Sequence, residues 1–178
     1  MRITISGPPG SGKTTTCKML SEELDLKAVV FGQFFREMAA ERGLTLGEFG
    51  ALAENDSTID KTIDSKILEV ARANSDIILE SRLSAYMLTR NGIPAFRIYL
   101  SASPEVRMAR VGVREGESLD DAVRKTIERQ ASEAKRYKMY YDIDIDDLSV
   151  YDLVISTDHL NPDQVTAKIL DALKECKC

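Results

Sequence analysis

The chain has 178 residues, of which 43% are hydrophobic and 30% charged, and its formal net charge at pH 7 is −5. This composition is ordinary for one globular domain with a buried core, so we expect a single domain over residues 1–178. The acidic balance disfavours general nucleic-acid binding. No apolar run approaches the roughly 18 residues that a membrane-spanning helix needs. With a strand already expected at residue 2, we also expect no signal peptide, and hence a cytoplasmic protein with no membrane partner. We expect this protein to be a monomer.

The first expected element is a short apolar strand, RITIS, at residues 2–6, and the segment GPPGSGKT follows it at once. Gly7 and Gly12 stand five positions apart and precede Lys13 and Thr14, which is the spacing of a phosphate-binding loop. Glycine adopts backbone angles that other residues avoid, so consecutive N–H groups can turn toward a polyphosphate. A helix predicted at residues 14–24 adds the favourable dipole of its N-terminus. The predicted ATP-binding residues here are Gly7, Pro8, Pro9, Gly10, Ser11, Gly12, Lys13, Thr14 and Thr15.

Two side chains of this loop are suited to chemistry on a bound nucleotide. Lys13 can reach the β- and γ-phosphates, so we predict a catalytic role for it, and the Thr14 hydroxyl can ligate Mg²⁺. A glycine turn with a surface lysine is the alternative. The strand before the loop and the helix after it favour the phosphate site, and we therefore expect ATP with Mg²⁺ as cofactor.

Four further β-rich runs follow, separated by helical patterns. Their nearly continuous apolar character suits a parallel sheet that is covered on both faces. Five strands with helical crossovers predict a doubly wound α/β domain, which with the phosphate loop is a P-loop kinase fold. The four runs are KAVVF (27–31), DIILE (76–80), AFRIYL (95–100) and YDLVIS (151–156).

Capping patterns predict where several helices begin. They are Ser57-x-x-Asp60, Ser103-Pro104-Glu105, Ser118-x-x-Asp121 and Asn161-Pro162-Asp163. Two segments are too long for simple crossovers, because residues 33–75 hold two or three predicted helices and residues 104–141 hold two. Extra helices on both sides of a phosphate loop indicate an acceptor-binding insertion at 33–75 and a lid at about 110–141.

A phosphate loop also occurs in GTPase switches and motors, but the guanine-specific pattern Asn-Lys-x-Asp is absent and the chain is short for a motor. A small kinase remains, and it needs a second cationic site for the acceptor. Arg36 follows the second predicted strand and Arg82 follows the third, at the sheet edge where α/β proteins bind ligands. A guanidinium grips phosphate oxygens in pairs, although each arginine could instead form a surface ion pair. Glu80 could orient the waters of Mg²⁺ or be a buried carboxylate held by loop N–H groups.

Several segments together resemble one family. They are ISGPPGSGKTT, FREMA, LESRL, REGES, SEAKRY and DIDDLSVYDLVIST, spread in order over nearly the whole chain. The chain resembles the nucleoside monophosphate kinases, and most closely the archaeal type of cytidylate kinase. The resemblance implies ATP-dependent phosphorylation of CMP, and of dCMP. Gln33 and Ser81 depart from the family pattern, which commonly has aspartate and glycine at these positions.

The lid segment is unusually basic. Residues 107–138 contain nine basic and six acidic side chains, a balance of +3 in a chain of −5. Arg129, Glu133 and Arg136 are spaced i, i+4, i+7 and fall on one helix face, where a solvated stripe of weak ion pairs is the alternative. The resemblance implies that Arg129 contacts the transferring phosphoryl group, Glu133 a ribose hydroxyl, and Arg136 the acceptor's base and phosphate. Arg110 and Arg114 would lie over the donor phosphates.

Two other functions remain open from the residues alone. One is a small kinase with another acceptor, such as UMP, AMP or a polar metabolite. The other is a regulatory protein that binds a nucleotide without turnover. The absence of the Asp-Gly-(Phe/Tyr)-Pro-Arg pattern of adenylate kinases counts against AMP.

Overall fold

Five parallel strands form the central sheet of the computed structural model, which describes residues 1–115 and 118–176 apart from the side chains of residues 114 and 115. Their order across the sheet is β2-β3-β1-β4-β5, and every pairing is parallel. This arrangement confirms the predicted five-stranded α/β fold. The strands are β1 (Arg2–Ser6), β2 (Ala28–Val30), β3 (Ile77–Glu80), β4 (Phe96–Ser101) and β5 (Leu153–Ser156).

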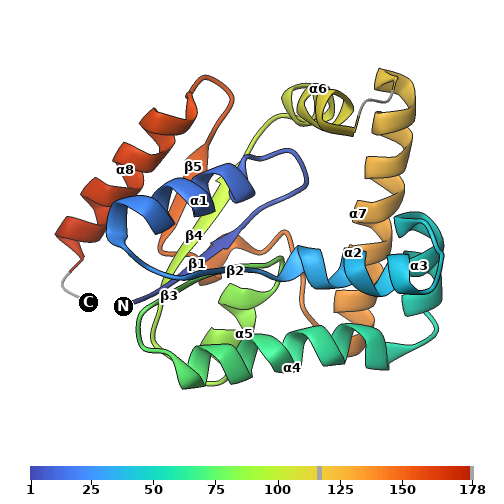
Figure 1. Ribbon diagram of the computed structural model, residues 1–178, viewed down its shortest axis with the longest axis horizontal. Coiled ribbons are helices and arrows are strands. Elements are labelled where there is room, and N and C mark those ends of the chain that lie inside the picture. Colours follow the sequence, from blue (N-terminus) through green and yellow to red (C-terminus); the bar gives the residue numbers. More distant parts are fainter. Residues whose placement is uncertain (116–117, 177–178) are drawn as a thin grey trace.

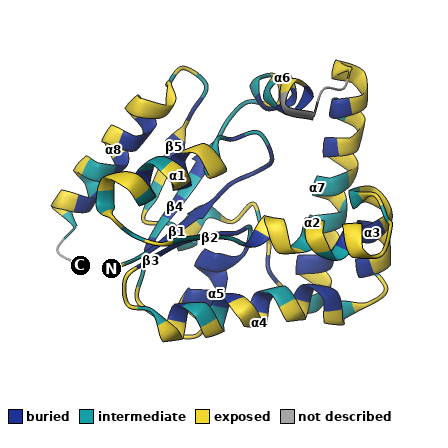
Figure 2. Ribbon diagram, viewed as in Figure 1, coloured by how far each residue is buried: buried dark blue, intermediate teal, exposed yellow. Residues whose placement is uncertain are grey.

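Helices cover both faces of this sheet (Figure 1). On one face, α1 (Lys13–Leu24) and α8 (Pro162–Glu175) pack on the strands, with Cys17, Leu20 and Ile169 in the core. On the other face lie α4 (Ser57–Ala73) and α5 (Ser84–Arg90), which bury Ile67 and Leu88. Figure 2 shows most of β1 and β3 in the buried colour, while the outer surfaces of α4 and α8 are exposed.

Four more helices lie beyond the core sheet, at its carboxyl edge. They are α2 (Phe31–Glu41), α3 (Leu46–Ala53), α6 (Pro104–Glu115) and α7 (Leu119–Tyr141). Helix α7 stands apart from α1 and α8, and α3 and α6 both pack against it (Figure 1). A separate small core of Ala39, Phe49, Ala53 and Ile59 joins α2, α3 and α4. No helix in the described part of the chain is long and apolar enough to cross a membrane.

Two predicted strands are shorter than expected. Strand β2 ends at Val30, and Phe31 begins α2 with its side chain buried in the core. Strand β5 begins at Leu153 and not at residue 151, because Leu148–Val150 form a 3₁₀ turn just before it. Asp152 then turns its carboxylate to the backbone N–H and the guanidinium of Arg97. The predicted end of β2 therefore belongs to a helix, and the predicted start of β5 directly follows a 3₁₀ turn.

The caps are mostly as predicted, with one exception. The Ser118 hydroxyl accepts from the N–H of Asp121, and Asn161 forms a reciprocal capping box with Gln164. The prediction that Ser57 caps α4 is wrong by one residue. The carboxylate of Asp56 accepts from the N–H of Thr58 at 3.0 Å, which makes Ser57 the first helical residue.

Candidate functional site

The loop between β1 and α1 has the backbone of a phosphate cradle. Gly10 and Gly12 have φ angles of 81° and 93°, in the left-handed region that favours glycine. Gly10 also lies close to α6, because a Cβ on it would stand 2.5 Å from the carbonyl oxygen of Arg107. Among the described residues, no side chain caps the N-terminus of α1 at Gly12. Uncapped first-turn N–H groups are available to an anion, which the helix dipole also favours.

Four cationic side chains hold the outer side of this loop. Each donates a hydrogen bond to one of four consecutive carbonyl oxygens. Lys13 donates to Pro8 at 3.0 Å, Arg82 to Gly7, Arg107 to Pro9 at 3.3 Å, and Arg110 to Gly10 at 3.2 Å. Because these carbonyls are engaged from outside, the loop is fixed without using the N–H groups that a phosphate needs.

A cavity of about 760 Å³ opens beside the loop, at the carboxyl edge of the sheet. It unites most of the predicted site residues from the loop, the acceptor side and the lid. The predicted residues that line it are Pro9, Gly10, Gly12, Lys13, Thr14, Thr15, Arg36, Glu80, Arg82, Arg110, Arg129, Glu133 and Arg136. Gly7, Pro8 and Ser11 belong to the loop but do not line the cavity. Arg114 is a helical residue of α6 whose side chain lies outside the described part of the structure.

The end of β3 brings an acid to the loop. The Thr14 hydroxyl donates to a carboxylate oxygen of Glu80 at 2.9 Å, and Glu80 is 5% exposed. Glu80 is therefore a buried carboxylate whose partner is a loop hydroxyl and not loop N–H groups, and its role in orienting the waters of Mg²⁺ stays a prediction. Among the described residues, no group of three or more His, Cys, Asp or Glu side chains could hold a metal by itself. Two oxygen donors beside a phosphate loop do fit Mg²⁺, which keeps several waters and takes its remaining ligands from substrate phosphates.

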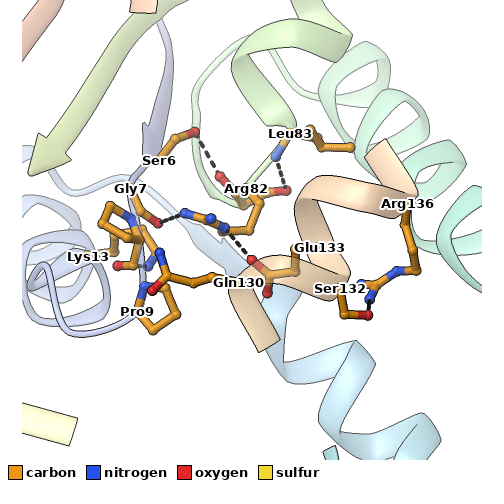
Figure 3. A network of polar contacts seen from close by, with 12 residues as sticks. Ser6, Gly7, Pro9, Lys13, Arg82, Leu83, Gln130, Ser132, Glu133 and Arg136 are labelled. Carbon is orange, nitrogen blue, oxygen red and sulfur yellow. Dashed lines mark hydrogen bonds and ion pairs between the residues drawn. The ribbon is translucent and has the colours of Figure 1, made fainter. Parts of the chain in front are cut away.

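Arg82 connects the loop to α7 (Figure 3). Its Nε donates to Glu133 at 2.7 Å, while its guanidinium also reaches the carbonyl of Gly7. Burial alone would raise the pKa of Glu133, but the charges of Arg82, Arg129 and Arg136 together outweigh it and hold that pKa below its usual value. Glu133 is therefore an ionised group that an arginine already orients.

The acceptor side contains a second, more deeply buried ion pair. Arg136 donates to Asp60 of α4 at 2.7 Å and to the Ser132 hydroxyl at 2.7 Å, and both charged side chains are under 5% exposed. The guanidinium also lies 5.3 Å from the ring centroid of Phe35. Arg136 thus forms part of the cavity wall between α4 and α7. Its assigned contact with the acceptor stays a prediction, as do the contact of Arg36 with the acceptor phosphate and that of Arg129 with the transferring phosphoryl group.

Sequence reasoning missed the α4 side of the cavity and one buried arginine. Asp60, Ile63 and Asp64 of α4 line the cavity, as do Phe31 and Phe35 of α2 and Tyr137 of α7. Asp60 and Asp64 stand one and five residues after Ile59, so two acids four apart beside an apolar stripe were the available signal. Arg107 donates to Ala102, Pro9 and Gln130. It is 8% exposed, and no pattern in the sequence indicated it.

The fold and the site together define the class of protein to which this chain belongs. A parallel sheet with a phosphate loop after β1, and an arginine-rich cavity at its carboxyl edge, make this a P-loop kinase fold. Solved structures share it at low sequence identity, among them shikimate kinases from Bacteroides thetaiotaomicron (TM-score 0.63, 17% identity, 99% of each chain) and Aquifex aeolicus (TM-score 0.61, 17% identity, 98% and 96%). An uncharacterized protein from Eubacterium ventriosum aligns with a TM-score of 0.74 at 18% identity over 99% of each chain.

Sequence comparison narrows the class to one family. The model of the cytidylate kinase-like family matches residues 2–159, and the chain belongs to this family. The cytidylate kinase of Methanocaldococcus jannaschii is 46% identical over 178 residues, covering 99% of each chain. That of Sulfurisphaera tokodaii is 44% identical over 172 residues, covering 97% of this chain and 94% of the relative. The resemblance seen in the sequence is thereby confirmed.

Proposed function

We propose that the protein transfers the γ-phosphoryl group of ATP to CMP, giving ADP and CDP, and that it also accepts dCMP. The observation that carries this proposal is the identity of about 45% to cytidylate kinases over nearly the full chain. The cavity supports it independently, because it brings together a phosphate loop and arginines from four other segments.

On the donor side, the loop N–H groups and Lys13 hold the β- and γ-phosphates. Arg110, which Thr157 anchors through hydrogen bonds of 2.9 Å to its hydroxyl and its carbonyl, lies over the same phosphates with Arg114. Thr14 would hold Mg²⁺ directly and Glu80 through water. The ion, when bound, supplies charge neutralisation on the phosphate oxygens.

On the acceptor side, Arg36 and Arg82 bind the phosphate of CMP. An oxygen of that phosphate attacks the γ-phosphorus in line, and the bond to the β-phosphate oxygen of ADP breaks. No general base is needed because the attacking oxygen is already ionised. Arg129 stabilises the charge on the transferring group, Glu133 accepts from a ribose hydroxyl, and Arg136 contacts base and phosphate. Positioning and electrostatics therefore supply most of the catalysis.

These roles assign functions to the two helical insertions of a single domain. We assign residues 33–75 to acceptor binding and residues 110–141 to a lid that closes over the phosphates. One chain carries the whole set of proposed roles, so the protein would work as a monomer. It would do so in the cytoplasm.

An acceptor screen tests the proposal. ADP formation from MgATP would be measured with CMP, dCMP, UMP, AMP and shikimate, the last because shikimate kinases share the fold. We expect CMP to have the highest kcat/KM. A preference for shikimate or AMP would contradict the proposed acceptor, and no turnover with any of them would favour a regulatory nucleotide-binding protein.

A further inference from the structure

The acceptor end of the cavity contains a carboxyl group that the phosphate transfer does not use. Asp64 lies on α4, lines the cavity and is 7% exposed. Its Oδ2 accepts a hydrogen bond of 2.5 Å from the hydroxyl of Tyr141 on α7. No other hydrogen-bond donor in the described part of the chain reaches Asp64. Among the described residues, its second carboxylate oxygen therefore has no hydrogen-bond donor, although Asp64 lines the cavity.

Arg136, whose charge acts on Asp64, does not form an ion pair with it. Arg136 is committed to Asp60, one helical turn earlier on α4. Burial, and after it the charge of Asp60, raises the pKa of Asp64 to about 7, against the opposing effects of Tyr141 and Arg136. A buried carboxyl without a cationic partner is unfavourable for the folded chain. An asparagine would keep the contact with Tyr141 without this cost, so the acid itself points to a role in binding.

The walls around Asp64 suit a flat ring. Phe31 and Phe35 from α2, Ile63 from α4 and Tyr137 from α7 line the same cavity. Aromatic faces of this kind stack on nucleobases, and stacking accepts any base. Discrimination between bases must then come from polar groups at the edge of the ring. Cytosine presents an exocyclic amine, which donates, where uracil presents a keto oxygen, which only accepts.

We propose that Asp64 is the specificity-determining residue for the acceptor base, its free carboxylate oxygen accepting a hydrogen bond from the exocyclic amine of cytosine. Uracil would place a keto oxygen against this acceptor and leave both groups unpaired in a buried site, which is the arrangement that gives large discrimination. Tyr141 is a positioning residue, because its hydroxyl holds the other oxygen of Asp64. This inference rests on the proposed function and adds the residue that selects the base.

A purely structural role for the Asp64–Tyr141 contact, tying α4 to α7, would not depend on the base. The deciding quantity is therefore the ratio of kcat/KM for CMP to that for UMP, in the wild type and in Asp64→Asn. We expect the substitution to lower kcat/KM for CMP and to narrow the ratio by on the order of 10²-fold, since an asparagine amide can donate to uracil. The KM for ATP should stay at its wild-type value.

Two further variants sharpen the test. Glu69→Gln removes an exposed carboxylate of the same helix, whose partner is Lys66, and should leave the ratio unchanged. Tyr141→Phe keeps Asp64 but removes its holding contact, and should narrow the ratio less than Asp64→Asn does. Calorimetric binding of CMP and UMP to the same variants provides a measurement that does not depend on turnover, and thermal melts verify that each variant is folded.

The possible results separate the two claims. A wild type that prefers CMP and an Asp64→Asn variant with the same CMP:UMP ratio would overturn the inference and leave the proposed function standing. A wild type that prefers UMP would overturn both. A narrowed ratio in Asp64→Asn, with wild-type behaviour in Glu69→Gln, would support the assignment of Asp64 to the base.

Discussion

At the scale of single residues, Lys13 combines a structural contact with a predicted catalytic charge. Its ammonium group donates to the carbonyl of Pro8, and it lines the cavity at the first turn of α1. We expect Lys13→Ala to lower kcat by on the order of 10²-fold or more, because a preorganised charge on the phosphates is removed. Steady-state kinetics would measure the loss. Lys18→Ala, which removes an exposed lysine of the same helix, is the matched control and should retain activity.

Near-normal turnover of folded Lys13→Ala would contradict the assignment of residues 7–15 to the donor phosphates. Circular dichroism and a thermal melt distinguish this outcome from misfolding. The hydrogen bond to Pro8 is worth only about 1 kcal/mol, so the fold should survive its loss.

Asp64 gives a second residue-scale prediction, on stability and pH. Its folded pKa of about 7 lies above the ordinary value of 3.8, so between these values the folded chain binds a proton that the unfolded chain has lost. Stability from this group is then full below about pH 4 and falls as the pH rises toward 7. Asp64→Asn removes this dependence. We expect its melting temperature to exceed that of the wild type at pH 8, with a smaller difference at pH 4.5.

Melting curves of both proteins at the two pH values provide this measurement. A chain of this size changes its melting temperature by roughly 2–4 °C per kcal/mol, so an effect of one kcal/mol is readily seen. An equal difference at both pH values would show that Asp64 does not titrate in this range. A more stable but less selective variant would be a direct exchange of stability for function.

At the scale of elements, α7 is one 23-residue helix that contributes Arg129, Glu133, Arg136 and Tyr137 to the cavity. Arg129 lines the cavity from the same helix face as Glu133. If Arg129 meets charge that develops during transfer, Arg129→Ala should lower kcat by about 10²-fold and change the KM for CMP much less. Arg124→Ala, at an exposed position of α7 paired with Asp121 and Glu128, is the control.

Comparable effects on kcat and on the KM for CMP would instead place Arg129 in ground-state binding. Wild-type kinetics together with a slightly lower melting temperature would favour the solvated stripe that the spacing alone also allows. Measuring both parameters at saturating ATP distinguishes these three cases.

Some elements and site residues could be predicted from the sequence, and others could not. The strand–loop–helix start was predictable because the spacing of Gly7, Gly12 and Lys13 has a physical meaning by itself. The start of α4 was misplaced because Asp56 and Ser57 are both good caps, and only the backbone decides between them. Asp64 was missed because the role of an acid on an amphipathic helix depends on its neighbour in space, Tyr141, which is 77 residues away.

At the scale of the whole molecule, the site exists only because distant segments meet. Arg82 and Glu133 are 51 residues apart, and Asp60 and Arg136 are 76 apart. Residue type and position in the chain indicated Arg82 as a site residue, and the family resemblance indicated Glu133 and Arg136. Their pairing depends on how α7 packs across the cavity. The parallel sheet was predictable from apolar runs, but the packing of α3 and α6 against α7 was not encoded in any local pattern.

A cavity with a proposed donor end and a proposed acceptor end leads to a prediction for the thermal stability of the whole fold. A non-hydrolysable ATP analogue and CMP should each raise the melting temperature, because each binds only the folded chain. At 100 times its dissociation constant, a ligand adds about 2.7 kcal/mol of stability. We expect the two shifts together to equal or exceed their sum, since in the proposed arrangement both ligands contact α7. Differential scanning calorimetry with each ligand alone and with both measures this directly.

A combined shift clearly below the sum would mean that the two ligands compete or oppose one another. Lys13→Ala should lose the analogue's shift and keep that of CMP. If it lost the CMP shift instead, the donor and acceptor ends would be reversed.

The four cations that hold the carbonyls of residues 7–10 have a consequence for protein engineering. One is in α1, one follows β3 and two are in α6, so the loop takes its shape from three separate parts of the chain. A segment copied from residue 7 to residue 14 into another sheet would carry Lys13 with it, but none of the three arginines. The phosphate loop of this protein is therefore not a portable module. Its transplantation into a new scaffold would require the ends of β3 and α6 to be rebuilt around it.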